Sequence, residues 1–406
     1  MSTNFITNKQ INNITAKLKA LGSSLMFPLI LLAFASLVLG ITYIFPKEWI
    51  TTTIISKIAM VIFDMFSYLV FYSLIITFHK EKDKTTLINA TLFLFVLISV
   101  QTSIKQITNI DEYLLSNSVF SMLLCSIAFI ITDKVIKWSW LWVGIGFFYA
   151  LVLVPILIVV DTIIKIIGVL IGMAPYGLNA FLYGVTNRLL LPFGLHSLMI
   201  PTFAYTAVGG VLEVTNCITK DITTISGDSV IWTYMYTNGL DFQSNAGEFM
   251  IGSESFTYKL INTTTPGQYQ QGFLPLITFI LPMMGIGYVI TNGWEKGKNI
   301  FIATLITMCS GLTEITEYIY LYTNIYLYLL EVFFTGISFM LCNILNVTVW
   351  ISTGWFIDII LFGLIPNING FETNWYWIPV IGISIGLVFS ILFNLIDKIS
   401  KKPISV

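Results

Sequence analysis

Charged residues are scarce in this sequence of 406 residues. Asp, Glu, Lys and Arg together make up 10% of the chain, whereas a typical soluble domain carries about 25%. Hydrophobic residues account for 56% and the mean hydropathy is +0.86. Because so little charge cannot cover a water-facing surface, the sequence predicts an all-α polytopic protein embedded in a lipid bilayer.

Other shortages exclude further classes of function. There are only two histidines, and the four cysteines (Cys125, Cys217, Cys309 and Cys342) lie far apart without a CxxC pair. This spacing gives neither a disulfide framework nor a zinc site. The net charge of −1 provides no basic face for phosphates. We therefore expect no metal, no cofactor and no nucleic-acid partner.

The first part of the chain contains clean membrane spans. About 20 apolar residues are needed for each span, and we searched for stretches with almost no Lys, Arg, Asp or Glu. Five such stretches occur here: Ala20–Pro46, Ile58–Phe78, Thr85–Ile104, Leu114–Thr132 and Trp138–Val160. The first 19 residues place Ile11, Ile14 and Leu18 at helical spacing beside lysines, which favours an interfacial amphipathic segment over residues 1–19.

The second part is less regular. Its apolar stretches are interrupted by Pro175, Pro192 and Pro201, and the polar segment Glu213–Gln271 separates them. In that segment we expect a surface loop and a re-entrant hairpin. The apolar stretches are Ile166–Asn187, Leu189–Leu212, Gly272–Trp294, Asn299–Leu330, Val332–Ile357 and Trp375–Ile396. About ten spans with some broken helices are predicted, and lysines near both ends predict cytoplasmic termini, with residues 401–406 as a tail.

Ionisable residues inside apolar stretches are costly and mark a pathway or a binding site by default. The candidates are Asp64, Arg188, His196, Glu314, Glu317, Glu331 and Asp358. Glu314 and Glu317 are three residues apart, so both carboxylates lie on one face of a helix. They could equally be solvated at a helix end on the membrane surface. Asp64 and Asp358 could form a pair or lie near the end of a span, and they are assigned no role. Glu331 could equally mark the boundary of a span and is assigned none either.

Arg188 and His196 share one apolar segment. Arg188 is the only arginine beside nineteen lysines, which indicates a need for its planar guanidinium group. A single histidine in such a segment is more often a satisfied structural group than a ligand. Pro192 and Gly194 favour a site, because broken helices at membrane depth are tolerated chiefly where they line a cavity.

Four strings in this chain resemble one family. Tyr183–His196, YGVTNRLLLPFGLH, resembles the "YGxxNRLLxPxGLHH" signature of glucose-type sugar permeases of the bacterial phosphotransferase system, the enzyme IIC component. Gly311–Tyr318, GLTEITEY, resembles their "GITEPIEF" loop. Ala246–Gly252 and Gly272–Pro282 are similar to their "GxFMxG" and "GFFPxMMFGLPAA" segments. The chain departs from these patterns at Ser197, Ile315, Met283 and Met284.

The resemblance implies a fold and a set of partners. The family is a helical homodimer in the bacterial plasma membrane, with a scaffold and an elevator-type transport domain that holds the sugar. Here the scaffold would cover residues 20–165 and the transport domain residues 166–400. Because the chain ends soon after the last span, we expect IIB and IIA functions on separate proteins. Translocation would be coupled to phosphotransfer only together with them.

The resemblance also implies roles for individual residues. Glu314 is the first choice for the acceptor of two sugar hydroxyls, and His196 would bond another hydroxyl. Asn187 and Glu317 complete the predicted substrate-binding set. Arg188 would be structural, bracing a hairpin or a glutamate, with Glu317 as its candidate partner. A carboxylate that accepts hydroxyls in a low-dielectric site discriminates strongly against analogues that lack them.

Two other classes of function fit the same residues. A proton-coupled secondary transporter would also place Glu and His inside the membrane. A degenerate permease that only binds or senses a sugar would fit the altered motifs. The sequence does not choose between glucose, N-acetylglucosamine, maltose and related glycosides, because specificity depends on the shape of the pocket.

Overall fold

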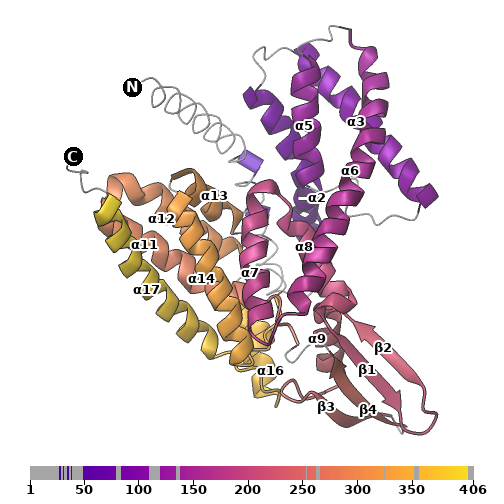
Figure 1. Cartoon of the computed structure of the whole chain (residues 1–406), viewed down its shortest axis with the longest axis vertical. Helices are drawn as coiled ribbons and strands as arrows, with labels where there is room; N and C mark the ends of the chain where they lie inside the picture. Colours follow the sequence, from indigo (N-terminus) through magenta and orange to yellow (C-terminus); the bar gives the residue numbers. More distant parts are fainter. Residues whose placement is uncertain are drawn as a thin grey trace. The chain divides into compact units, whose positions relative to one another are not determined.

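The structure is a computed structural model of the whole chain (Figure 1). It describes residues 49–78, 84–108, 119–133, 138–252, 254–261, 266–311, 313–323, 325–351 and 356–400, with six isolated positions between 27 and 38. The predicted amphipathic segment 1–19, both ends of the chain and nearly all of the expected first span lie outside the described residues. The chain divides into two compact units, which we call unit 1 and unit 2.

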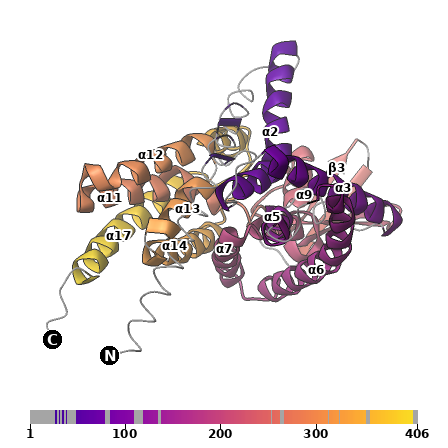
Figure 2. The same cartoon turned by 90° about the horizontal axis from the view of Figure 1, so that it is seen from above.

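Unit 1 consists mainly of Phe45–Ile164 together with Phe193–Leu198. Its helices are α2 (Ile50–Phe78), α3 (Lys84–Thr108), α5 (Val119–Asp133) and α6 (Leu141–Gly172), whose last turns belong to unit 2. Seen from above, α5 is viewed end-on with the other three around it (Figure 2).

An aromatic core joins the helices of unit 1. Phe129 of α5 stacks on Trp142 of α6 with 4.4 Å between ring centroids, and Phe93 of α3 contacts both rings. Phe71 of α2 completes the cluster. These rings are buried, while Phe95 and Phe148 are 72% and 62% exposed. Large apolar side chains on the outside of a helix suit contact with lipid.

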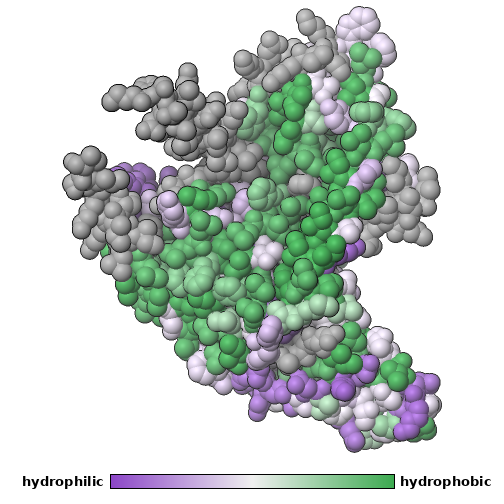
Figure 3. Space-filling view, in the orientation of Figure 1, coloured by the Kyte–Doolittle hydropathy of each residue, from purple (hydrophilic) through white to green (hydrophobic). Residues whose placement is uncertain are grey.

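Four described helical segments are long and apolar enough to cross a membrane. They are Lys84–Ser103, Leu141–Gly172, Phe273–Asn292 and Ile325–Ile344. A fifth span would be formed by Ile50–Ile62 and Met65–Phe78, which join at a bend of 40°. In Figure 3, hydrophobic residues cover much of the visible helical surface and hydrophilic residues gather over the strands. A multi-pass membrane protein is consistent with this pattern, whereas the count of about ten spans stays a prediction.

Unit 2 consists mainly of Lys165–Pro192 and Met199–Val406. Its longer helices are α7 (Leu178–Leu190), α11 (Leu281–Asn292), α12 (Trp294–Ser310), α13 (Glu314–Thr323), α14 (Ile325–Ile344) and α17 (Trp377–Ser400). The short α10 (Phe273–Pro275) runs into α11 through a π-helical segment, Leu276–Ile280. Another π-helical segment, Ile359–Leu364, joins α15 (Phe356–Asp358) to α16 (Ile365–Ile368). The helix α8 (His196–Tyr205) follows a 3-10 turn at Leu191–Phe193.

Glycines bring α7 and α14 into close contact. A Cβ atom on Gly184 of α7 would lie 2.8 Å from the Phe339 ring, and one on Gly336 of α14 would lie 2.6 Å from Val185. Small residues at a helix interface let the two backbones approach closely, which is a common means of packing helices in membranes. This contact fixes the position of α7, which carries Asn187 and Arg188.

A four-stranded antiparallel sheet occupies part of the polar segment, so the all-α prediction is wrong there. The strands are β1 (Val211–Asn216), β2 (Ile222–Ser226), β3 (Ala246–Ile251) and β4 (Glu254–Ile261), in the order β2-β1-β4-β3. The helix α9 (Asp228–Thr237) packs on one face through Ile231, Trp232 and Met235 against Leu212, Val214, Tyr258 and Leu260. In β1, apolar and polar residues alternate with the period of a half-solvated strand, a signal that a count of polar residues does not detect.

Candidate functional site

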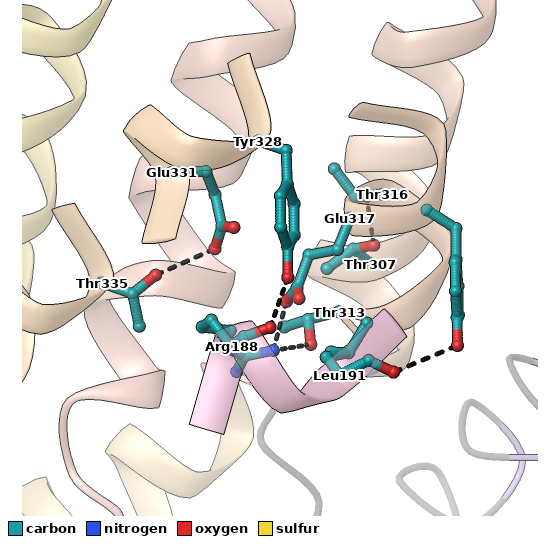
Figure 4. A network of polar contacts seen from close by, with 10 residues as sticks. Arg188, Leu191, Thr307, Thr313, Thr316, Glu317, Tyr328, Glu331 and Thr335 are labelled. Atoms are coloured by element: carbon teal, nitrogen blue, oxygen red, sulfur yellow. Dashed lines mark hydrogen bonds and ion pairs between the residues drawn. The ribbon is translucent and has the colours of Figure 1, made fainter. Parts of the chain in front are cut away.

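A buried ion pair joins α7 to α13. The side chain of Arg188, near the end of α7, is 4% exposed, and that of Glu317 in α13 is 0% exposed. Arg188 Nη1 donates a hydrogen bond to Glu317 Oε1 (Figure 4). It donates another to Thr313 Oγ1, with 2.6 Å between the two atoms. Both hydrogen bonds use the same nitrogen of the guanidinium group.

Local geometry explains why the glutamate string reaches Arg188. Gly311 ends α12 with a backbone φ of 77°, a left-handed conformation that glycine adopts without steric cost. The chain then turns into α13, where the Glu317 N–H donates to the Thr313 carbonyl at 3.0 Å. The hydroxyls of Thr307 and Thr316 share a hydrogen bond of 2.6 Å that ties α12 to α13. The string is therefore a turn between two helices, with Thr313 and Glu317 one helical turn apart.

Two further elements contact Arg188. The Phe273 ring of α10 lies 4.7 Å from Arg188 Cζ, a cation–π contact. The Tyr328 hydroxyl of α14 donates to the backbone carbonyl of Arg188. The Tyr318 hydroxyl donates to the Leu191 carbonyl at 3.2 Å, one turn further along. Arg188 thus contacts α10, α13 and α14, the helices that surround α7 at this level.

Glu331 belongs to the same cluster, although sequence reasoning gave it no role. Its carboxyl is 0% exposed, and its Oε1 accepts a hydrogen bond of 2.9 Å from Thr335 Oγ1. Its charge interacts with those of Arg188 and Glu317. The spacing of Tyr328, Glu331 and Thr335 along α14, three and then four residues, places them on one helical face. That spacing is the sequence signal that indicates Glu331.

The structure places the predicted substrate-binding residues as follows. Asn187 is buried beside Arg188 on α7, and Glu314 is half-buried as the first residue of α13. Glu317 is fully buried, so the alternative of two solvated glutamates does not hold for it. His196 begins α8 and belongs to the segment grouped with unit 1. A shared pocket of His196 with Glu314 therefore stays a prediction.

The buried carboxyl of Asp228, which the sequence analysis did not single out, anchors a loop of unit 2. Asp228 at the start of α9 accepts hydrogen bonds from the backbone N–H of Gly267 at 2.7 Å and of Tyr269 at 3.1 Å. Burial raises the pKa of the Asp228 carboxyl to about 7, against the lowering effect of these N–H donors. The loop leads directly into α10, so Asp228 helps to position Phe273 under the arginine.

A metal centre finds no support in the described part of the chain. There, no three His, Cys, Asp or Glu side chains are grouped so as to hold an ion. The cluster around Arg188 instead offers carboxyl, amide and hydroxyl groups in an apolar surrounding. Such groups can bind a neutral polar ligand by hydrogen bonds, with aromatic rings nearby.

Comparison with known proteins gives a consistent set of relatives. The family model described as "Phosphotransferase system, EIIC" matches residues 22–336. The maltose-specific EIICB component of the phosphotransferase system of Escherichia coli K12 is 28% identical over 221 residues, 52% of this chain and 36% of that protein. The glucoside-specific EIICBA component of Staphylococcus carnosus is 26% identical over 231 residues, 55% of this chain and 29% of that protein.

A third relative matches a shorter part. The glucose-specific EIICBA component of Mycoplasma genitalium is 30% identical over 159 residues, 38% of this chain and 17% of that protein. In each case the aligned part spans about a third or less of the relative's length.

Proposed function

Because the chain belongs to the EIIC family of the phosphotransferase system, we propose that it is a membrane permease that binds a glucose-type sugar and translocates it while a IIB protein phosphorylates it. The relatives' names support a glucose-type sugar, since they specify maltose, glucoside and glucose. The individual sugar is left to experiment.

The single observation that carries this proposal is the Arg188–Glu317 ion pair. Together with the bond from Arg188 to Thr313, it fixes the first turn of α13. Glu314 begins that turn, half-buried and three residues before Glu317. In our proposal Glu314 is therefore held in place by the ion pair at the next turn of α13, and its carboxylate accepts sugar hydroxyls.

The other roles follow from the same proposal. Asn187, next to Arg188, contributes an amide whose buried Nδ2 has no hydrogen-bond partner among the described residues. His196 bonds the hydroxyl that receives the phosphoryl group and eases its deprotonation. The phosphoryl group comes from the cysteine of IIB, which IIA recharges. Arg188 and Glu317 hold the helices and act on the sugar through Glu314.

We propose the family's domain division for this chain as well. Residues 20–165 would form the scaffold of a homodimer, and residues 166–400 the transport domain that moves as an elevator. The separation of the compact units between Ile164 and Lys165 supports this division. Both termini would face the cytoplasm, where IIB and IIA act.

Uptake into vesicles tests the proposed function. Vesicles containing the protein are given labelled glucose, N-acetylglucosamine, maltose or a glycoside, with and without phosphoenolpyruvate, the general phosphocarriers, IIA and IIB. We expect one of these sugars to accumulate as its phosphate only in the complete mixture. Accumulation of unmodified sugar driven by a proton gradient would instead identify a secondary transporter, and binding without uptake would identify a sensor.

A further inference from the structure

The charges around Arg188 do not balance. Glu317 and Glu331 are both fully buried, and Arg188 is the only buried cationic side chain in the described part of the protein. Two ionised carboxylates and one guanidinium would leave one excess negative charge in an apolar interior. Such a charge is not tolerated without a partner, since burying an isolated ion costs far more than a typical protein's stability.

The hydrogen bonds distinguish the two carboxyl groups. Glu317 Oε1 accepts from Arg188 Nη1, so Glu317 is the ionised partner. Glu331 Oε1 accepts only from the neutral hydroxyl of Thr335, whereas the Oε2 atoms of both carboxyl groups have no hydrogen-bond partner among the described residues. In Figure 4, Glu331 lies beside Tyr328 on the inner side of α14. Two buried carboxyl groups that interact electrostatically with a single guanidinium group titrate as a coupled pair, in which a proton on one group is favoured.

Among the described residues, the other groups that face the cluster do not supply a second positive charge. From α13 and α14 these are the hydroxyls of Tyr318, Tyr320 and Tyr328 and the half-buried carboxyl of Glu314. α10 contributes the uncharged Phe273, and α12 contributes Thr307. The large buried side chains of α17 up to residue 392, the part of this helix whose side chains are described, are apolar: Ile378, Ile381, Ile385 and Phe389.

We propose that the Arg188–Glu317–Glu331 cluster is a proton-binding site that holds one proton on the Glu331 carboxyl while the cluster is buried. With that proton, the cluster is one guanidinium, one carboxylate and one neutral acid, so its net charge is zero. Loss of the proton leaves a net negative charge that is stable only when water enters. Proton binding at Glu331 therefore favours the closed packing of α7, α13 and α14.

This inference extends the proposed permease function but is tested without sugar, IIB or transport. Infrared spectroscopy of the purified protein detects the carbonyl stretch of a protonated carboxyl. The spectrum is taken at pH 8, because this pH is above the pKa of Asp228, about 7, so that Asp228 is mostly ionised and adds little to the band. We expect this band in the parent protein and its loss in Glu331→Gln. Glu295→Gln is the matched control, because Glu295 is 84% exposed and pairs with Lys298 on the surface. It should keep the band.

A second variant makes the test independent of how well Glu331→Gln folds. In Glu317→Gln the arginine loses its ionised partner, so Glu331 is expected to ionise in its place and the band should again be lost. In addition, the unfolding midpoint of the parent should fall as the pH rises above 8, because the folded cluster must give up its proton, and Glu331→Gln should reduce this slope. A parent spectrum without the band, or a band that survives in either variant, would overturn the proposal.

Discussion

Arg188 Nη1 donates hydrogen bonds to both Glu317 and Thr313, and so joins the end of α7 to the first turn of α13. The guanidinium group is buried and also lies over the Phe273 ring. We expect exchange of this arginine for lysine to be costly, because a compact ammonium group lacks the planar face that lies over the Phe273 ring. The relationship explains why one arginine is kept in a chain whose other basic residues are lysines.

The first prediction concerns this ion pair. Arg188→Ala should lower the free energy of unfolding by roughly 3–5 kcal/mol, because it leaves a buried carboxylate without its partner. Arg188→Lys should also lower the free energy of unfolding, but by a smaller amount. Thermal unfolding in detergent measures both, with Lys298→Ala in the exposed Lys298–Glu295 pair as the control, where about 0–1 kcal/mol is expected. An Arg188→Lys variant that melts and transports like the parent would show that the geometry of the guanidinium group is dispensable.

The second prediction concerns the contact between α7 and α14. Gly336→Ala should destabilise the protein by about 1–3 kcal/mol, because its Cβ would meet Val185 at 2.6 Å and Phe181 at 2.8 Å in a packed interface. Gly144→Ala in α6 is the matched control, since its Cβ would have no neighbour within 4 Å. That substitution should leave the unfolding midpoint unchanged or raise it. Equal midpoints for the two variants would argue against the tight packing of α7 on α14.

The third prediction concerns Asp228 and pH. Its pKa of about 7 lies above the ordinary value, so the folded state binds this proton more tightly than the unfolded state does. The stabilising contribution is complete below the unfolded value near 4 and is lost as the pH rises through 7. The unfolding midpoint of the parent should therefore decline between pH 5 and 8 more steeply than that of Asp228→Asn.

The same variant should also be less stable at every pH. The Asn amide group would turn a donor toward the N–H of Gly267 or Tyr269, where the carboxyl now accepts. Parallel pH profiles for the parent and Asp228→Asn would contradict the assignment of this titration to Asp228.

The sequence predicts the membrane class and several helices well, because long apolar runs leave few alternatives. The stretches Thr85–Ile104 and Trp138–Val160 fall within α3 and at the start of α6. Counting polar residues does not reveal the sheet, because a strand with one solvated face contains polar residues. On that face of β1 these are Glu213 and Thr215. Only the alternation in residues 211–216 indicates the sheet.

The site is predicted less completely than the fold. The lone arginine and the family resemblance together point to Arg188 and to Glu317 as a possible partner, and the structure pairs them. The sequence alone does not show whether Glu331 is a buried residue of the site or a residue at the end of a span. Its place in the cluster depends on Arg188, which is far away in sequence. Asp228 could not be singled out within the polar segment, because its partners Gly267 and Tyr269 are also far away in sequence. The role of Glu314 and the involvement of His196 remain predictions.

In our proposal the cluster around Arg188 holds Glu314 in position to bind a sugar. The most direct test is equilibrium binding of labelled glucose, N-acetylglucosamine and maltose to the purified protein and to Glu314→Gln, with Glu295→Gln as the control. A hydrogen bond to a charged group is worth about 1.5–3 kcal/mol, so Glu314→Gln should bind the preferred sugar roughly ten- to over a hundredfold more weakly. Glu295→Gln should bind like the parent. Equal affinity of the parent and Glu314→Gln for that sugar would contradict the proposal.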